Sequence, residues 1–111
     1  MDIIKQNYAI LDLERMPTHP GEILLEDFLL PLNISQTKLA NDLGVSFKTV
    51  NEIINQKRSM TPDISLRLSK YFGTSPHVWL GLQMDYDLYK AYKNKINKKN
   101  IESIRPLEFS N

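Results

Sequence analysis

Residues 35–55 constrain the fold of this chain more than any other stretch, because they combine two helix starts with one tight turn. Ser35 and Ser46 each precede a helical pattern and can cap its first turn with the side-chain oxygen. Gly44 tolerates the left-handed backbone that such a turn needs, and Ala40 is small enough for two helices to cross closely. The stretch therefore predicts helices over residues 36–43 and 47–56 joined by a short turn, which is a helix-turn-helix.

Start and stop signals predict three further helices outside this motif. A proline in the first helical position starts helices at Pro20, Pro62 and Pro76. Pro31 is expected to end the first of them, Gly73 ends the second, and the last continues to about residue 92. Since 111 residues suffice for one modest core, we expect a single all-α domain, a compact five-helix bundle.

The two ends of the chain stand apart from this domain, which we place at residues 17–93. Residues 1–16 form an N-terminal extension whose pattern fits a short strand or a turn of helix equally well. Residues 94–111 are polar and lysine-rich. We therefore expect this tail to be loosely ordered, or to order only against a partner.

Composition excludes several classes of function. The chain has no cysteine, which rules out disulfides and cysteine-ligated metal sites. No apolar run approaches the roughly 18 residues that span a bilayer, and no signal peptide is evident, so we expect a cytoplasmic protein without membrane contact. The two histidines, His19 and His77, stand beside prolines at helix starts, where a structural role is the simpler interpretation. We expect no enzymatic activity, no cofactor and no metal.

The charge is unevenly distributed, although the net charge is only +1. Residues 1–35 carry two basic and six acidic side chains, whereas residues 36–70 carry six basic and three acidic ones. Residues 71–111 carry six basic and four acidic side chains. The positive surplus thus coincides with the helix-turn-helix, which is a weak indication of a nucleic-acid partner.

The second helix of the motif exposes side chains that suit DNA once its apolar residues, Val50, Ile53 and Ile54, face the core. Its outer surface then carries Phe47, Lys48, Asn51, Glu52 and Asn55. A helical hairpin without a ligand is the alternative, but it does not call for residues of the kind that read base edges in a major groove. We therefore predict binding of double-stranded DNA, with residues 36–55 as the reading unit.

The individual side chains suit different contacts. Lys48 and Asn51 are the first choices for base contacts, because lysine suits the acceptors of guanine and asparagine suits adenine. Glu52 either accepts a hydrogen bond from cytosine or pairs with Lys48 one turn before it. Phe47 either touches a thymine methyl group or folds back as a hydrophobic lid.

The remaining candidates are expected to hold the phosphate backbone. Gln36, Ser46 and Thr49 lie beside the free amides at the starts of the two helices, where they can contact or buttress phosphate. Asn55, Lys57 and Arg58 follow the reading helix and are expected to clamp the backbone.

Short motifs spread over residues 16–92 belong together in one known family. They are His19-Pro-Gly-Glu22, Ser35-Gln36, Leu43-Gly-Val-Ser46, Lys57-Arg58, Thr61-Pro62, Phe72-Gly-Thr-Ser75 and Trp79-Leu80. On these motifs the chain resembles the HigA-type antitoxins, a branch of the phage-repressor-like (XRE) helix-turn-helix proteins. The chain departs from the pattern at Gln56, where many members of the family have glycine, so the loop after the reading helix can differ in conformation.

The resemblance implies a repressor that dimerises through its C-terminal helix and binds an operator ahead of its own operon. The dimer surface would draw on Trp79, Leu82, Tyr86 and Tyr89, for which core packing is the alternative, above all for Trp79. The resemblance also implies a second partner, a small basic HigB-type ribonuclease toxin that the antitoxin neutralises. A solitary regulator without a toxin is the alternative.

Overall fold

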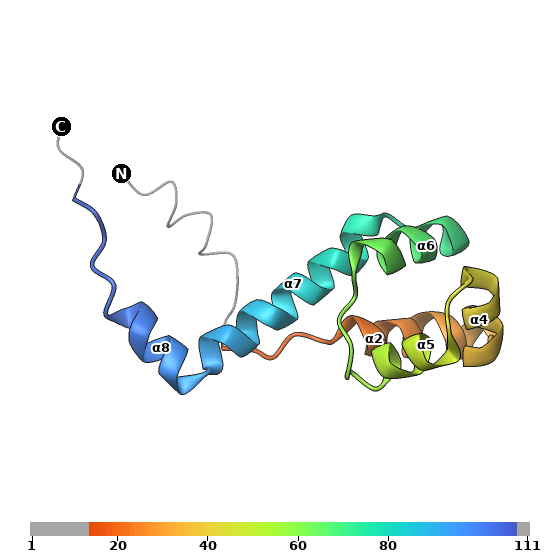
Figure 1. Ribbon diagram of the computed structural model, residues 1–111, viewed down its shortest axis with the longest axis horizontal. Coiled ribbons are helices and arrows are strands. Elements are labelled where there is room, and N and C mark those ends of the chain that lie inside the picture. The colour runs from red at the N-terminus through yellow and green to blue at the C-terminus, as the bar shows by residue number, and fades with distance from the viewer. Residues whose placement is uncertain (1–13, 109–111) are drawn as a thin grey trace.

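The computed structural model describes residues 14–108, and every regular element in that range is a helix (Figure 1). The first helix is continuous over residues 20–32 and consists of α2 (Pro20–Ile23), the π-helical η1 (Leu24–Leu29) and α3 (Leu30–Leu32). The others are α4 (Gln36–Leu43), α5 (Phe47–Ile54), α6 (Pro62–Phe72), α7 (Pro76–Lys93) and α8 (Lys95–Glu102). The all-α class is confirmed, but the described residues form six helices rather than the five expected. The mixed pattern predicted for the N-terminal extension lies largely outside the described residues.

The helix starts follow the capping signals of the sequence. The hydroxyl oxygens of Ser35, Ser46 and Thr61 accept hydrogen bonds from the amides of the third residue of α4, α5 and α6. Ser75 caps α7 in the same way through the amide of His77. Each cap satisfies an amide that the helix itself leaves without a partner, which is why these starts could be predicted to the residue.

Pro31 does not end the first helix, contrary to expectation. In the turns before it the amide of Leu30 donates to the carbonyl of Leu25, which is π-helical spacing. These wider turns relieve the crowding between the proline ring and the carbonyl four residues earlier, the contact that breaks an ordinary α-helix. The helix ends instead at Asn33, whose backbone is left-handed with φ 55°.

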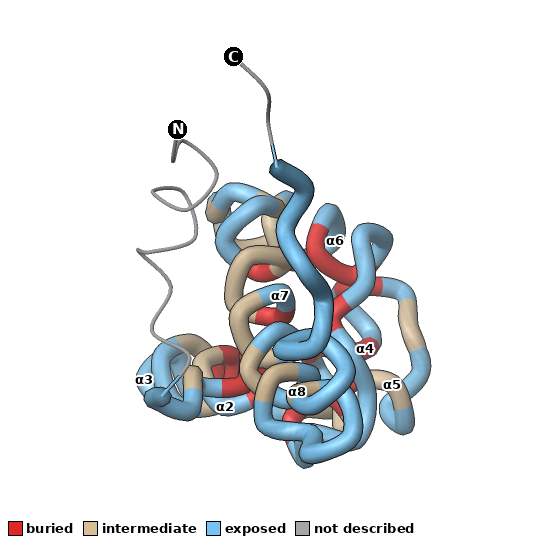
Figure 2. The backbone as a smooth tube through the Cα atoms, turned by 90° about the vertical axis from the view of Figure 1, so that its left-hand side faces the viewer, coloured by how far each residue is buried: buried red, intermediate tan, exposed pale blue. Residues whose placement is uncertain are grey.

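The core lies where α2, α4, α5 and α6 surround the first turns of α7, as the buried segments in Figure 2 show. The side chains of Leu39, Leu68 and Trp79 are fully buried there. The indole nitrogen of Trp79 donates to the hydroxyl of Thr74 over 2.8 Å, so the large ring is buried without an unsatisfied donor. This core fixes the positions of α4 and α5, the two helices of the predicted motif.

The second half of α7 and all of α8 extend away from this core and give the molecule an extent of 58 × 28 × 22 Å. The expectation that the tail is loosely ordered was wrong for residues 95–102, which form α8. The side chain of Asn94 caps this helix by accepting a hydrogen bond from the amide of Asn97 over 3.0 Å. No residue of α8 is buried. Among the described helices, none combines the length and the apolarity needed to cross a membrane.

Candidate nucleic-acid interface

The turn between α4 and α5 has the geometry that the sequence predicts. Gly44 adopts the left-handed conformation with φ 70°, and the amide of Val45 returns to the carbonyl of Ala40 over 3.0 Å. Ala40 is buried at the crossing of the two helices. On α5, Val50 and Ile53 are buried with it, so the opposite face of α5 points outward as expected.

Arg67 of α6 supports this turn, and sequence reasoning missed it. Its guanidinium donates to the carbonyl of Leu43 at the end of α4 over 2.7 Å, and also pairs with Asp63 one turn earlier on α6. The carbonyls at the end of a helix lack internal partners, and a cationic donor satisfies one of them here. The amino-acid sequence gives no local signal for this contact, because the contact joins residues that lie 24 positions apart.

The inner side of α5 is held by a close backbone approach from α2. A Cβ atom at Gly21 would lie 1.9 Å from the carbonyl oxygen of Ile53, so glycine alone fits. His19 fixes the start of α2, since its Nδ1 accepts from the amide of Gly21 over 2.9 Å and its ring meets the ring of Tyr86 edge-on. Burial lowers the pKa of His19 despite the nearby carboxylate of Asp87, which favours the neutral ring that this cap requires. The His-Pro-Gly opening is therefore a support for α5.

Phe47 and Lys48 lie at the outward start of α5. Phe47 is 51% exposed, which excludes the closed hydrophobic lid and leaves its side chain free for contact with a ligand. Lys48 is exposed, and within the described residues its ammonium enters no ion pair. Both side chains are therefore available on the surface that we predicted.

Asn51 belongs to a chain of amides that crosses from α4 to α5. Its Nδ2 donates to Oε1 of Gln36 over 3.0 Å, and its Oδ1 accepts from Nδ2 of Asn55 over 3.1 Å. An asparagine amide has two donor hydrogens and two acceptor lone pairs. The network therefore leaves one donor and one acceptor free on Asn51, which is the pair that the N7 and N6 atoms of adenine require.

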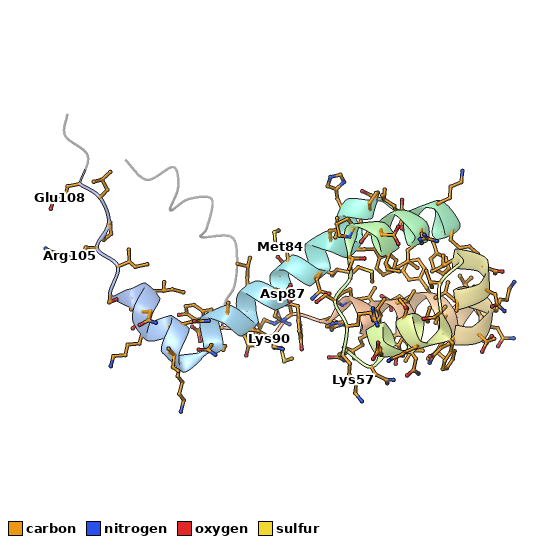
Figure 3. The ribbon with its side chains drawn as sticks, viewed as in Figure 1. Lys57, Met84, Asp87, Lys90, Arg105 and Glu108 are labelled. Carbon is orange, nitrogen blue, oxygen red and sulfur yellow. The ribbon has the colours of Figure 1, made fainter. Side chains whose placement is uncertain are left out.

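Glu52 and Arg58 form an ion pair. Neither of the two roles considered for Glu52, a contact with cytosine or a pair with Lys48, included Arg58. The guanidinium of Arg58 donates to Oε1 of Glu52 from two nitrogens, at 2.6 and 3.0 Å. This hydrogen bonding lowers the pKa of Glu52, and the nearby Lys48 and Lys57 add to the effect. Of the two alternatives for Glu52, the pairing with Lys48 is replaced by this pair, and Arg58 is held by Glu52 rather than free. Lys57 projects from the loop after α5, as Figure 3 shows.

The other predicted residues have local partners. The hydroxyl of Ser46 caps α5 and lies 2.9 Å from the hydroxyl of Thr49, so both stand at the helix start beside its free amides.

Gln56 takes the left-handed backbone with φ 62°. Glycine adopts this conformation most easily, so glutamine here keeps such a loop at the cost of backbone strain. This turn is why α5 ends at Ile54, two residues earlier than expected.

The residues expected on a dimer surface mostly face the core. Trp79 is fully buried and Leu82 packs against the core, so core packing is the correct alternative for both. Tyr86 contacts His19, and Tyr89 lies beside the ammonium of Lys93. For Tyr86 and Tyr89, which are half-buried, a place on a dimer surface remains a prediction. A different row on α7 lines an open groove: the exposed Met84, Leu88 and Ala91 and the half-buried Leu80, flanked by the buried Gln83 and the exposed Asp87.

Comparisons with known proteins agree with this geometry. The family model named Helix-turn-helix matches residues 25–79. Virulence-associated protein I of Dichelobacter nodosus is 44% identical over 89 residues, 80% of each chain. Antitoxin HigA-1 of Vibrio cholerae is 34% identical, over 85% of this chain and 87% of its own length. The chain belongs to the helix-turn-helix family that includes the HigA antitoxins.

Solved structures of antitoxins have the same fold. The Pseudomonas aeruginosa antitoxin HigA, solved with the higBA promoter, is 44% identical with a TM-score of 0.76. The antitoxin GraA in complex with its operator is 37% identical with a TM-score of 0.77, over 86% of this chain and 95% of its own. The match to the P. aeruginosa HigA takes in 99% of that chain but 83% of this one. The remaining residues of this HigA-family chain lie outside that match.

Proposed function

We propose that this chain is a dimeric transcriptional repressor that binds operator DNA ahead of its own operon and acts as the antitoxin of a small basic HigB-type ribonuclease toxin in the cytoplasm. The observation that carries the proposal is the outward face of α5. It presents an exposed lysine and an asparagine whose free donor and acceptor are oriented by Gln36 and Asn55. Relatives solved on operator or promoter DNA support it.

In this proposal α5 enters the major groove and its outward residues read base edges. Lys48 suits the O6 and N7 acceptors of guanine, and Asn51 suits adenine. The amides at the starts of α4 and α5 bind phosphate on either side, together with Lys57. Catalysis has no part in this proposal.

The exposed apolar row on α7 supports the dimer. Met84 is 58% exposed and Leu88 is 42% exposed, and they lie on one helix face with Leu80 and Ala91. Burying this row against a second copy would remove apolar surface from water, and Met84 projects freely from α7 for such a contact (Figure 3). Two reading helices related by a two-fold axis would then lie about 34 Å apart, one turn of B-DNA.

The toxin partner is supported by the family and by charge. The first helix lies in the acidic first third of the chain and carries three acidic side chains, Glu22, Glu26 and Asp27. Glu26 and Asp27 add negative charge to the outer surface of this helix. A ribonuclease that binds RNA phosphates carries positive charge, so an acidic surface is what an inhibitor of it needs.

Two measurements on the full-length chain test the proposal. Fluorescence anisotropy compares the duplex upstream of the gene with a shuffled duplex, and tighter binding to the native sequence is expected. Co-purification from the source cells should recover a small basic protein in stoichiometric amount. Specific DNA binding without such a protein would identify a solitary regulator, and equal binding to both duplexes would contradict the repressor role.

A further inference from the structure

Few positive charges remain free around the reading helix. Lys38 pairs with Asp42 over 2.9 Å, and Arg58 pairs with Glu52. Within residues 36–58 this leaves Lys48 and Lys57 without an ion pair, which gives four free cations in a dimer. A protein that makes about six to ten phosphate contacts binds DNA with a steep salt dependence, and four free cations supply fewer contacts than that. The helix-turn-helix by itself is therefore poor in charge for its role.

A second group of free cations lies on α8. Lys95, Lys98 and Lys99 are spaced i, i+3 and i+4, so they share one face of the helix. Within the described residues none of the three enters an ion pair. Lys98 lies 5.0 Å from the ring centroid of Tyr92, which holds it against the end of α7. No residue of α8 is buried, so the positive charge of this face is not needed for the core.

The position of α8 suits contact with the same DNA. In Figure 1 α7 reaches its lowest point at the turn into α8, at about the level of α5, and α8 then turns upward and away from the core. Figure 2, viewed at a right angle, shows α8 at the level of α5 and well below α6. A duplex that lies along the outer side of α5 and continues past the end of α7 would pass the turn between α7 and α8, where Lys95 begins α8.

We propose that the face formed by Lys95, Lys98 and Lys99 is a second DNA contact, which binds phosphate oxygens of the duplex beside the sequence read by α5. The contact is independent of base sequence, because lysine ammonium groups on a helix surface bind phosphates as point charges. It supplies the charge that the helix-turn-helix lacks. The proposal rests on the DNA-binding function proposed above and adds to it a longer footprint.

The exposed isoleucines of α8, Ile96 and Ile101, flank the lysine face, one on each edge, and Asn97 and Asn100 lie on the opposite side. Glu102 shares the face with the three lysines, so the face keeps a surplus of two positive charges (three lysines and one glutamate). Because the centre of the face consists of charged side chains with a positive surplus, it suits a phosphate backbone better than an apolar protein groove. An oligomeric state that depends on α8 would indicate a protein partner instead.

The test measures DNA affinity against salt concentration for the wild type and for Lys95→Gln/Lys99→Gln. Two duplexes are used, one that ends at the operator and one that extends about 10 base pairs beyond it on both sides. The slope of the logarithm of DNA affinity against the logarithm of salt concentration should become shallower by about 0.9 for each phosphate that the variant no longer neutralises. Between about 50 and 200 mM salt, the drop in affinity should then be about 3.5-fold smaller for each such phosphate. The wild type should bind the longer duplex more tightly, and the variant should lack that gain.

Lys70→Gln is the matched control, because Lys70 is an exposed lysine on α6, at the opposite end of α7 from α8. It should leave the salt slope unchanged. Deletion of residues 95–111 is a second variant that removes the face altogether, and since no residue of α8 is buried, circular dichroism should show the core intact. The proposal would be overturned if both α8 variants kept the wild-type salt slope. It would also be overturned if they changed the oligomeric state of the protein and left the salt slope unchanged. Because phosphate contacts act on any duplex, the slope on shuffled DNA tests the α8 contact even if operator specificity fails.

Discussion

Replacing Gly21 with alanine should destabilise the protein strongly through one backbone contact. The new Cβ atom would lie 1.9 Å from the carbonyl oxygen of Ile53, about 1.5 Å short of the 3.4 Å at which ordinary contact begins. The obstacle is backbone in the last turn of α5, so no side-chain rotation can relieve it. Overpacking of a core typically costs about 1–3 kcal/mol, and a rigid obstacle places this case at the upper end, about 3 kcal/mol.

Urea unfolding followed by circular dichroism measures this free energy, and thermal unfolding should show a melting temperature lower by about 12–24 °C for a domain of this size. Gly81→Ala is the control, because Gly81 is also helical but a Cβ atom there would meet nothing within 4 Å. It should be neutral or stabilise the protein by up to about 1 kcal/mol, since alanine favours helix more than glycine does. Wild-type stability in Gly21→Ala would refute the close approach of α2 and α5.

Three further predictions concern the loop, the buried histidine and the dimer. Gln56→Gly should raise the free energy of unfolding by about 1 kcal/mol, since glycine relieves the strain of the left-handed backbone; a lower stability in urea would contradict this. The pKa of His19 is lowered in the folded state, so the unfolded chain binds the proton more readily, and stability should fall as pH drops below about 6.5 through the lower folded pKa. His19→Asn keeps a capping oxygen and should flatten that pH dependence, and an unchanged profile would assign it to other groups. Met84→Glu should weaken the dimer in analytical ultracentrifugation without lowering monomer stability, and a dimer of unchanged strength would exclude the α7 row as its interface.

The features that sequence predicted well are those decided within a few residues. The caps at Ser35, Ser46 and Thr61 and the left-handed turn at Gly44 depend on one side chain and its neighbouring amides. The inward face of α5 follows from its apolar spacing. The outward residues of α5 can therefore be predicted as a set from the sequence, whereas their contacts with bases remain predictions.

The features that sequence did not predict depend on parts of the chain that meet only in the fold. The sequence left open whether Trp79 packs in the core or lies on a dimer surface, and only the fold, in which Trp79 is fully buried and Tyr86 contacts His19, decides for the core at Trp79. The pairing of Glu52 with Arg58 required the loop to turn back on α5. The helix α8 was missed because its polar composition resembles a disordered tail, and its start depends on one asparagine cap.

The most direct test of α5 as the reading helix is the ratio of dissociation constants for operator and shuffled duplexes, measured for Lys48→Ala and Lys57→Ala. If Lys48 reads a base, its removal should weaken operator binding by about 1–3 kcal/mol and reduce the ratio by about 5- to 150-fold. Lys57→Ala removes a phosphate contact and should weaken both duplexes equally. Equal weakening on both duplexes for Lys48→Ala would contradict base reading by this face of α5.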